Sequence, residues 1–370
     1  LAAAPEAAAG LSFSGVFIPG INRRDYGAIA PGATFDAFFV TPDMREGFAA
    51  GRVRFRPMHY SAIYAFLRDA AGCALAFAKV APPGPDGRMS LGNTADFLPA
   101  MIEAGVPVVA EIDPSMPTVP GAPALAREAC ALVLEGPSAP VLYDPGGPDA
   151  DTAAIGRHVA TLVEPGDTIQ LGIGKVAAGV QAALAGHRGL SVHGGLVTPA
   201  LVPLVEAGVV SGPVTTGTAL GDAAFYAALP GWDRLVLAPA GYTHSPATLA
   251  SIPRLVTINS VLSVDLFGQA NGEMVNGRQI SGQGGMVDFV RGGRLSPGGR
   301  SILAFPSTAG RDRASRIVPA LPAGTVATVA RADADIYVTE HGIARVRDLD
   351  LDARAAALVA ISDPAHRDAL

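Results

Sequence analysis

The chain contains 370 residues, of which 49% are hydrophobic and 16% charged, and its formal net charge is −6. This length predicts about two domains with sizeable cores, and the negative balance with scattered Lys and Arg argues against nucleic-acid binding. No apolar run reaches the roughly 18 residues of a membrane-spanning helix. Cys73 and Cys130 lie in apolar segments, which is typical of buried thiols in a reducing cytoplasm. We therefore expect a cytoplasmic globular protein.

The first half of the chain ends in a segment rich in Gly, Pro and Asp. Residues 1–10 are Ala-rich and predict the end of a helix whose preceding strand is absent. Residues 141–152, VLYDPGGPDADT, are typical of a linker. We therefore predict an N-terminal α/β domain over residues 1–145, lacking its first strand, and a C-terminal α/β domain over residues 150–370.

Strands alternate with helices through the second half. Apolar strands are expected at residues 168–174, 189–197, 233–240 and 254–260. Helical spacing predicts helices at residues 176–187, 199–210 and 351–361. The first of these helices should end near Gly186 and the last before Asp363-Pro364. The alternation predicts layers of helices on a parallel sheet.

The first chemical motif is a glycine turn, LGIGKVAAG, at residues 171–179. Its G-x-G-x-x-A pattern between a strand and a helix could hold a pyrophosphate on backbone N–H groups. A dinucleotide site would also need an acidic residue about 20 positions later, where GLSVHGGLV supplies none. A structural turn is therefore favoured over a nucleotide site, and the phosphates of another ligand remain open.

Other familiar sites are poorly supported. GLSVHGGLV nearly matches the G-x-S-x-G nucleophile elbow, but His193 occupies the place of the last glycine. Ser14 and Ser191 both lack the full motif and ordered Asp and His residues downstream. The seven histidines form no H-x-x-x-H and there is no close Cys pair, so no metal site is expected. His193 alone is more often a hydrogen-bonded strand residue than a catalyst.

A glycine-rich segment at residues 276–293, NGRQISGQGGMVDFVRGG, is a stronger signal. The structural interpretation is a β-bulge or hairpin region in which only glycine fits. The functional interpretation is a backbone that approaches a ligand closely, with N–H groups that hold an anion or a developing oxyanion.

Several long motifs carry a family resemblance. Residues 281–309, SGQGGMVDFVRGGRLSPGGRSILAFPSTA, and the preceding INSVLSVDLFGQ resemble the acetyl-CoA hydrolase/transferase family, which includes 4-hydroxybutyrate and succinyl-CoA:acetate CoA-transferases. Further segments match in the family's order: PDGRMSLGNTADF, EIDPSMPTVPG, PGDTIQLGIGKV, SVHGGLV, YTHSPATLASIPRLVTINS and YVTEHGIA. The resemblance implies an enzyme with two related open α/β domains of the NagB/RpiA/CoA-transferase type and an active site between them.

The resemblance also implies where coenzyme A binds. The family's CoA-contacting positions fall on Gly172, Ile173, Gly174, Lys175, Val176, Leu262, Ser281, Gly284 and Gly285. The backbone N–H of Gly285 is the implied oxyanion donor. A family lysine after PSTA is replaced by Gly310, so its phosphate contact is expected to have moved, with Arg311 as the candidate.

The implied catalytic residue is missing. Family members that transfer CoA carry His-x-Glu at a strand end, and this Glu attacks the thioester. In His193-Gly194-Gly195, Gly195 stands at the Glu position, and Ser263 replaces a second family carboxylate. Glycine has no nucleophile, and a serine hydroxyl without a base is nearly inert at neutral pH.

Three interpretations remain open. The protein is an enzyme that cleaves or exchanges a small acyl-CoA without a covalent glutamate, hydrolase-like rather than a transferase, with water activated by His193 or Glu340 and the oxyanion held by the glycine loop. Alternatively it binds CoA or acyl-CoA without turnover, or the two replacements were introduced into the chain. We favour the first. In this interpretation coenzyme A is a substrate or product, and no metal takes part. The family resemblance favours a homodimer. A small carboxylate is the alternative to water as the acceptor of the acyl group or of CoA.

Overall fold

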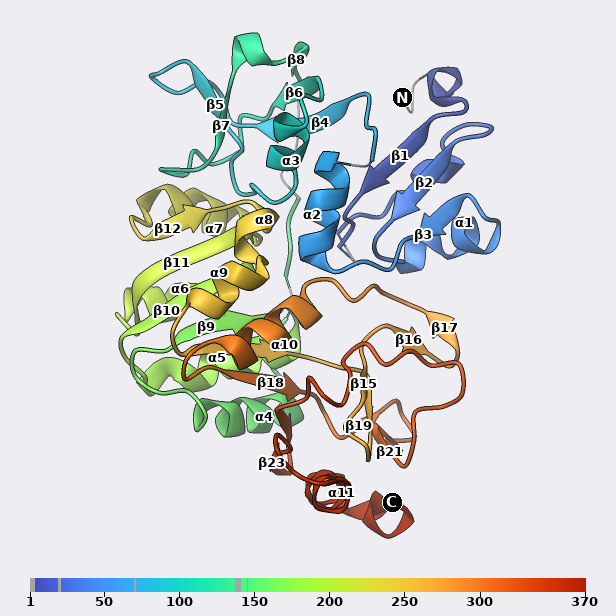
Figure 1. The fold of residues 1–370 in the computed structure, drawn as a ribbon. Helices are drawn as coiled ribbons and strands as arrows, with labels where there is room; N and C mark the ends of the chain where they lie inside the picture. The colour runs from blue at the N-terminus through green and yellow to red at the C-terminus, as the bar shows by residue number, and fades with distance from the viewer. Residues whose placement is uncertain (1–3, 19–20, 70, 137–140, 145) are drawn as a thin grey trace.

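The computed structural model describes residues 4–18, 21–69, 71–136, 141–144 and 146–370, and shows an α/β protein built on one large sheet (Figure 1). Within these residues the sheet contains eight strands in the order β12-β11-β10-β9-β13-β18-β22-β23. Neighbouring strands are parallel except β22 and β23. The strands are β9 (Thr168–Leu171), β10 (Leu190–Val197), β11 (Val210–Ala219), β12 (Leu235–Leu237), β13 (Leu255–Asn259), β18 (Arg300–Ala304), β22 (Ile336–Thr339) and β23 (Gly342–Arg345).

Helices cover both faces of this sheet because its parallel strands are apolar on both sides. The helices α4 (Ala150–Ala160) and α5 (Lys175–Ala183) share a core with Ile302 on one face. On the other face, α10 (Met286–Leu295) packs with Leu303 and with α9 (Pro246–Ser251). Successive strand residues point to opposite faces, so the sequence Ile302-Leu303 joins both cores.

The first two helices of this sheet approach each other closely. α4 begins at a capping box in which the Asp149 side chain accepts from the Thr152 backbone N–H. A Cβ on Gly156 would collide with the backbone carbonyl of Gly179, and a Cβ on Gly179 with that of Thr152. Only glycine at both positions lets α4 and α5 lie this close, and the close contact fixes the start of α5 after β9.

The N-terminal part forms smaller sheets above the large one (Figure 1). Its strands pair in the orders β1-β2-β3, β4-β6-β8 and β5-β7. The elements are β1 (Ser12–Gly15), β2 (Thr34–Ala37), α1 (Arg45–Ala49), β3 (Val53–Phe55), α2 (Tyr60–Asp69), β4 (Ala76–Val80), β5 (Arg88–Ser90), α3 (Leu98–Glu103), β6 (Val108–Ile112), β7 (Ala124–Ala126) and β8 (Leu132–Glu135).

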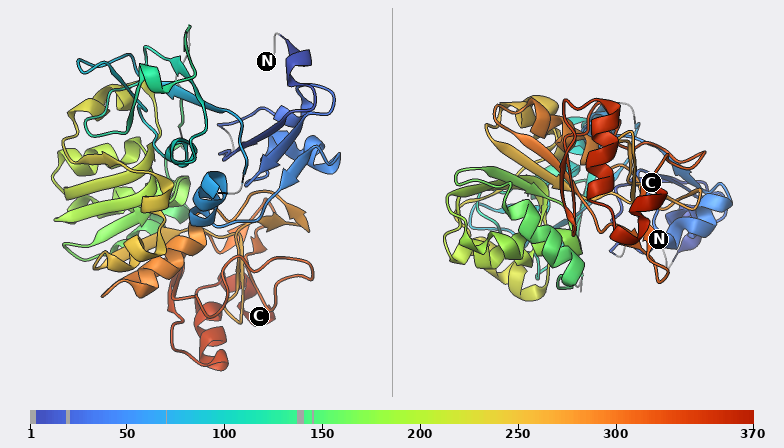
Figure 2. Two further views of the ribbon diagram at one scale, coloured as in Figure 1. Left: turned by 45° about the horizontal axis from the view of Figure 1, so that its top comes forward. Right: turned by 90° about the horizontal axis from the view of Figure 1, so that it is seen from below.

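The remaining elements of the second half are short. The helices are α6 (Val202–Glu206), α7 (Ala223–Ala228), α8 (Ala240–Thr243) and α11 (Leu351–Ala360). The strands are β14 (Ser263–Asp265), β15 (Ala270–Asn271), β16 (Met274–Val275), β17 (Arg278–Gln279), β19 (Thr308–Ala309), β20 (Ala314–Ser315) and β21 (Ile317–Val318). Figure 2 shows most of these small strands beside the large sheet, near the N-terminal strands β1 to β3.

The predicted fold class is confirmed, and the predicted strands and helices of the second half are found within a few residues of their expected limits. Several other elements, among them α4, β18, β22 and β23, were not predicted, and the reasons are clearest for two of them. β11 was not predicted because its sequence, VSGPVTTGTA, is rich in Thr and Gly and lacks a continuous apolar run. α10 occupies part of the segment interpreted as a bulge or hairpin, since its two glycines disguise a helix that packs closely on its neighbours. No helix in the described part of the chain is long and apolar enough to cross a membrane.

The two halves meet along α2, the loop before α3, α8 and the start of α10. The Tyr60 backbone N–H donates to the Gly284 carbonyl at 3.1 Å. The Ser61 hydroxyl donates to Asp288 of α10 at 2.7 Å. The Ala95 backbone N–H donates to the carbonyl of Gly217 in β11 at 2.8 Å. These bonds place residues of both halves around the carboxyl end of β10.

Candidate active site

Gly195, where the family resemblance implies a glutamate, lies near the carboxyl end of β10 and faces an imidazole. A Cβ on Gly195 would lie 2.8 Å from Cε1 and 3.0 Å from Nε2 of His244. Real Cβ contacts are rarely this short, so the ring fills the space that a side chain would need. Any side chain at residue 195 would therefore compete with the His244 ring for the same space.

The same imidazole contacts the glycine loop. A Cβ on Gly285, the residue before α10, would lie 2.5 Å from His244 Nε2. The ring is therefore enclosed between Gly195 and Gly285, two positions that the sequence placed in one site. In this closed arrangement both glycines are required for space, and neither has a φ angle in the left-handed region.

His244 follows α8 and is 3% exposed. Its Nδ1 lies 2.9 Å from the Thr243 hydroxyl, which in turn lies 3.4 Å from the Pro239 carbonyl. The hydroxyl has one proton: when the Pro239 carbonyl accepts it, Nδ1 carries the ring proton and the lone pair is on Nε2, and when Nδ1 accepts it, Nε2 carries the ring proton. Burial, and then the neighbouring His193, lower the pKa of His244 to about 3, so the ring is neutral at physiological pH.

His193, one of the predicted catalytic residues, holds the segment that carries His244. Its Nε2 bonds the Thr243 carbonyl at 3.1 Å, and because a carbonyl only accepts, this nitrogen carries the proton. Burial lowers the pKa of His193 as well. The observed role of His193 is thus to position α8.

Two side chains from the N-terminal half complete the cluster. The Tyr60 ring lies 4.3 Å from the His244 ring, centroid to centroid, and Phe289 of α10 lies 4.6 Å away on another side. The Tyr60 hydroxyl donates to Oδ2 of Asp96 at 2.6 Å. Oδ1 of Asp96 is buried without a hydrogen-bond partner among the described residues. We call His244, Tyr60 and Asp96 the histidine cluster.

Asp96 lies beside Gly217 of β11. Its Oδ1 and the Gly195 carbonyl oxygen each lie 3.1 Å from the point where Gly217 would carry a Cβ, so both oxygens border this glycine. Burial of the carboxyl raises the pKa of Asp96 to about 7, and the hydrogen bond from Tyr60 opposes this shift. Burial, with Asp96 as a second cause, also raises the pKa of Tyr60.

The predicted CoA loop Gly172–Val176 connects β9 to α5. Gly174 has φ +93°, in the region that favours glycine, and a Cβ there or on Gly172 would meet no heavy atom within 4 Å. Lys175 is exposed and forms an ion pair with Asp149 at 3.2 Å. Ile173 and Val176 are partly buried. The loop therefore presents backbone on an open surface at the end of the strand next to β10.

Ser263, predicted at the position of the second family carboxylate, and the other predicted CoA contacts lie on the short strands or in the loops beside them. The Ser263 hydroxyl accepts from Asn271 Nδ2 at 3.1 Å, and the Leu262 backbone N–H donates to the Asn271 carbonyl at 2.8 Å. The Ser281 carbonyl accepts from Gln279. Gly284 has φ +55° and accepts from Tyr60, as described above. Arg311 is exposed in the turn between β19 and β20.

Glu340, the second candidate base, is not brought to Gly195. It follows β22, which is four strands from β10 and therefore about 19 Å away at ordinary strand spacing. Its carboxylate accepts from the Ser307 backbone N–H at 2.9 Å and from the Ser307 hydroxyl at 2.5 Å. The fold thus assigns this carboxylate to the loop after β18, away from the histidine cluster.

The histidine cluster was missed from the sequence. His244 lies in the YTHSP segment used for the family resemblance, but nothing in its spacing relates it to Gly195. Tyr60 and Asp96 belong to the other half, and only the packing of α2 against α8 brings them near. In the described part of the chain, no group of three or more His, Cys, Asp or Glu side chains has the geometry of a metal site.

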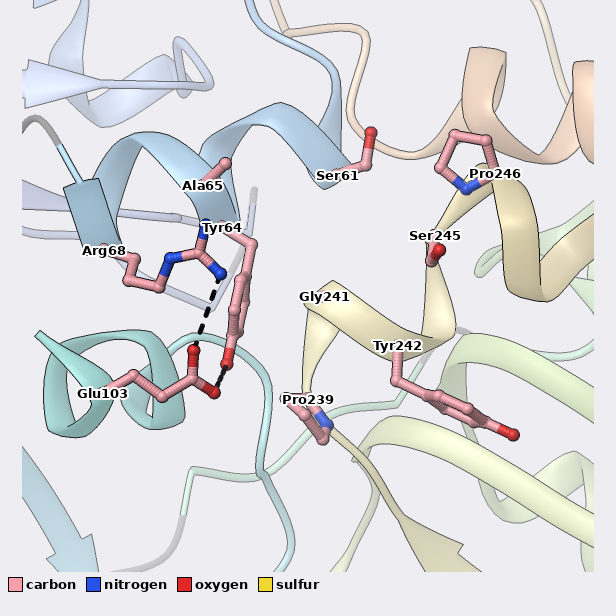
Figure 3. Close-up of a pocket in the computed structure, with 10 residues that line it drawn as sticks. All are labelled: Ser61, Tyr64, Ala65, Arg68, Glu103, Pro239, Gly241, Tyr242, Ser245 and Pro246. Atoms are coloured by element: carbon pink, nitrogen blue, oxygen red, sulfur yellow. Dashed lines mark hydrogen bonds and ion pairs between the residues drawn. The ribbon is translucent and has the colours of Figure 1, made fainter.

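A pocket of about 440 Å³ opens beside the cluster, between α2, α3 and α8 (Figure 3). Figure 3 shows the Tyr64 hydroxyl and Arg68 directed toward Glu103, with Tyr242 and Ser245 on the opposite wall. None of the predicted CoA contacts lines it. The pocket therefore marks the groove between the halves next to the histidine cluster, whereas Gly195 and Gly285 lie against the His244 ring.

Comparisons with known proteins agree with this architecture. The model of the acetyl-CoA hydrolase/transferase N-terminal domain matches residues 26–128, and that of the C-terminal domain matches residues 221–370. A 4-hydroxybutyrate coenzyme A transferase of Clostridium kluyveri is 30% identical over 344 residues, which cover 90% of this chain and 80% of the relative.

A further relative and a solved structure extend the comparison. An acetyl-CoA hydrolase of Saccharomyces cerevisiae is 29% identical over 212 residues, which cover 54% of this chain and 38% of the hydrolase. The crystal structure of RipA from Yersinia pestis superposes with a TM-score of 0.89 at 25% identity, covering 99% of this chain and 94% of RipA.

Proposed function

Because the chain belongs to the acetyl-CoA hydrolase/transferase family and is an enzyme of that family, we propose that it hydrolyses a small acyl-CoA thioester without a covalent glutamyl intermediate. One observation carries the proposal: Gly195 has no side chain, and the His244 ring fills the space beside it. The route through an acyl–glutamyl anhydride therefore has no first step at this position. Water takes the place of the attacking carboxylate.

The site offers the other requirements of thioester cleavage. The start of α10 at Gly285 presents backbone beside His244, at a helix N-terminus that favours a developing oxyanion. The open loop Gly172–Val176 supports binding of the CoA moiety, since backbone N–H groups at the start of α5 can approach phosphate or pantetheine oxygens. Arg311 is a more distant candidate for a phosphate contact.

A panel of short-chain acyl-CoAs tests the proposal. Release of free thiol should occur with water alone and should not increase when acetate or butyrate is added as an acceptor. Borohydride, which reduces glutamyl thioesters, should leave the mass and activity of the protein unchanged after incubation with acyl-CoA. Thiol release that depends on an added carboxylate, or a reduced glutamate found by peptide mapping, would instead support transfer through another carboxylate.

We also propose that the protein is a cytoplasmic homodimer, as expected from its composition and from the family resemblance. Light scattering coupled to size-exclusion chromatography should give twice the mass of the chain. A monomer at micromolar concentration that still hydrolyses acyl-CoA would contradict the dimer and leave the proposed reaction intact.

A further inference from the structure

We propose that His244 has replaced the missing glutamate as the catalytic group, and that its Nε2 is the general base that activates water. This inference rests on the proposed hydrolysis. It names the residue that supplies the chemistry, a residue that the expected sequence motifs do not include.

The first argument is position. Nε2 is the His244 atom near both Gly195 and Gly285, at 3.0 and 2.5 Å from the places where their side chains would begin. A family glutamate would extend from the first of these positions, and the implied oxyanion donor is the second. No residue in the described ranges donates or accepts a hydrogen bond at Nε2, so this nitrogen is available to a water molecule or a ligand.

The second argument is the state of the ring. The tautomer that the proposal uses is the one in which Nδ1 donates to the Thr243 hydroxyl and this hydroxyl donates to the Pro239 carbonyl, which leaves the lone pair on Nε2. The titratable groups around the ring are His193, Tyr60 and, through Tyr60, Asp96. Burial and the neighbouring His193 lower the pKa of the ring, which keeps it neutral but also makes Nε2 a weak base in the free protein. Negative charge that develops on the thioester oxygen would favour the protonated ring as the reaction proceeds.

The reaction then balances without another reagent. Nε2 takes a proton from water as the water oxygen bonds to the thioester carbon, and the carbonyl electron pair moves to the oxygen held near Gly285. The tetrahedral intermediate collapses, the carbon–sulfur bond breaks, and the proton on Nε2 passes to the CoA sulfur. The products are a carboxylic acid and free CoA, with one water consumed.

Asp96 is the competing candidate for the base. Its Oδ1 is buried, unpartnered among the described residues and beside Gly217 of β11. Its other oxygen is held by Tyr60, whose ring packs on His244. We assign Asp96 to positioning Tyr60 against the imidazole. A Cβ built on Gly195 or Gly285 would contact His244, and Asp96 is not among the nearest neighbours of either position.

The test compares His244→Asn, Asp96→Asn and a control, His158→Asn, which changes a histidine in the last turn of α4. With the best acyl-CoA of the panel, His244→Asn should lower kcat at least a hundredfold and change KM less than threefold, as expected for loss of a general base. Asp96→Asn should lower kcat less than His244→Asn does, and His158→Asn should leave both constants unchanged. Circular dichroism and thermal melting establish that each variant is folded.

A second measurement separates catalysis from packing. His244→Gly opens space for a free imidazole, and added imidazole should restore thiol release in a concentration-dependent manner. Failure of rescue in a folded, CoA-binding variant, or a His244→Asn variant within threefold of wild type, would overturn the assignment while leaving the hydrolysis in place. A larger loss in Asp96→Asn than in His244→Asn would move the base to Asp96, and an acyl adduct trapped on His244 would make it a nucleophile. No thiol release by the wild type would overturn the proposed function, and this inference with it.

Discussion

Two glycine segments lie at the ends of neighbouring strands, and they use glycine for different reasons. After β9, a Cβ on Gly172 or Gly174 would meet open space, and Gly174 is required for its φ of +93°. Beside β10 and α10, Gly195 and Gly285 have ordinary backbone angles but no room, because His244 lies between them. The first segment leaves backbone open to a ligand, whereas the second makes room for an imidazole.

The largest effect on stability is expected at Gly195, because the His244 ring fills the space beside it. Gly195→Glu places a carboxylate against His244 and should lower the free energy of unfolding by about 3 kcal/mol or more, through overpacking and burial of a charge. Urea unfolding measures the loss. The matched control is Gly186→Glu, at an exposed glycine with nothing within 4 Å, which should have little effect. Equal stability of the two variants would mean that the ring moves aside freely and that the space is not reserved for it.

The pH dependence of the free energy of unfolding tests the protonation state of Asp96 in the histidine cluster. Because burial raises the pKa of Asp96 to about 7, above the value near 4 of an unfolded chain, the folded state favours the protonated form. Protonated Asp96 therefore contributes on the order of a few kcal/mol to the free energy of unfolding. This contribution is complete below about pH 4 and is lost as the pH rises through 7. Asp96→Asn should therefore flatten the stability curve between pH 5 and 8, measured by urea unfolding.

The control for this prediction is Asp233→Asn, which changes an exposed carboxylate after α7. Its pH curve should match that of the wild type. A wild-type curve that does not fall relative to Asp96→Asn as the pH rises would show that Asp96 is ionised in the folded protein at neutral pH.

In the open loop Gly172–Val176, the expected loss is in affinity for CoA. Gly174→Val adds a β-branched side chain at a positive φ angle and should weaken CoA binding at least tenfold, about 1.4 kcal/mol, by changing the backbone at the start of α5. Calorimetry with CoA measures this change. Undiminished binding by the folded variant would place CoA away from this loop.

The smallest effect is expected at Gly172→Ala. The φ angle of Gly172 is not in the left-handed region, and the added methyl group meets nothing within 4 Å, so the free energy of unfolding should change by less than about 0.5 kcal/mol. Any loss in CoA affinity would therefore report direct crowding of the ligand. A thermal melt that falls by several degrees would show that this loop is packed more tightly than the structure indicates.

The sequence predicted the scaffold of the site but not its central residue. The order of motifs was enough to relate Gly195 to Gly285, and the strand–glycine–helix pattern located Gly172–Val176. The order of strands in the sheet could not be read from the chain, so Glu340 was named as an alternative base to His193 although four strand positions separate β22 from β10. His244, Tyr60 and Asp96 come from three separate segments, and only tertiary packing brings them together.

The central claim is that His244 occupies the place of the family glutamate, and the double variant Gly195→Glu/His244→Gly tests it most directly. Removing the ring should relieve the overpacking of Gly195→Glu and place a carboxylate beside Gly285. The measurement is CoA transfer from acyl-CoA to acetate, with borohydride trapping of the glutamyl thioester. We predict a gain of at least a hundredfold over the wild type, about 2.7 kcal/mol of barrier, and an adduct on residue 195. A folded double variant that binds acyl-CoA but shows neither exchange nor an adduct would contradict the account.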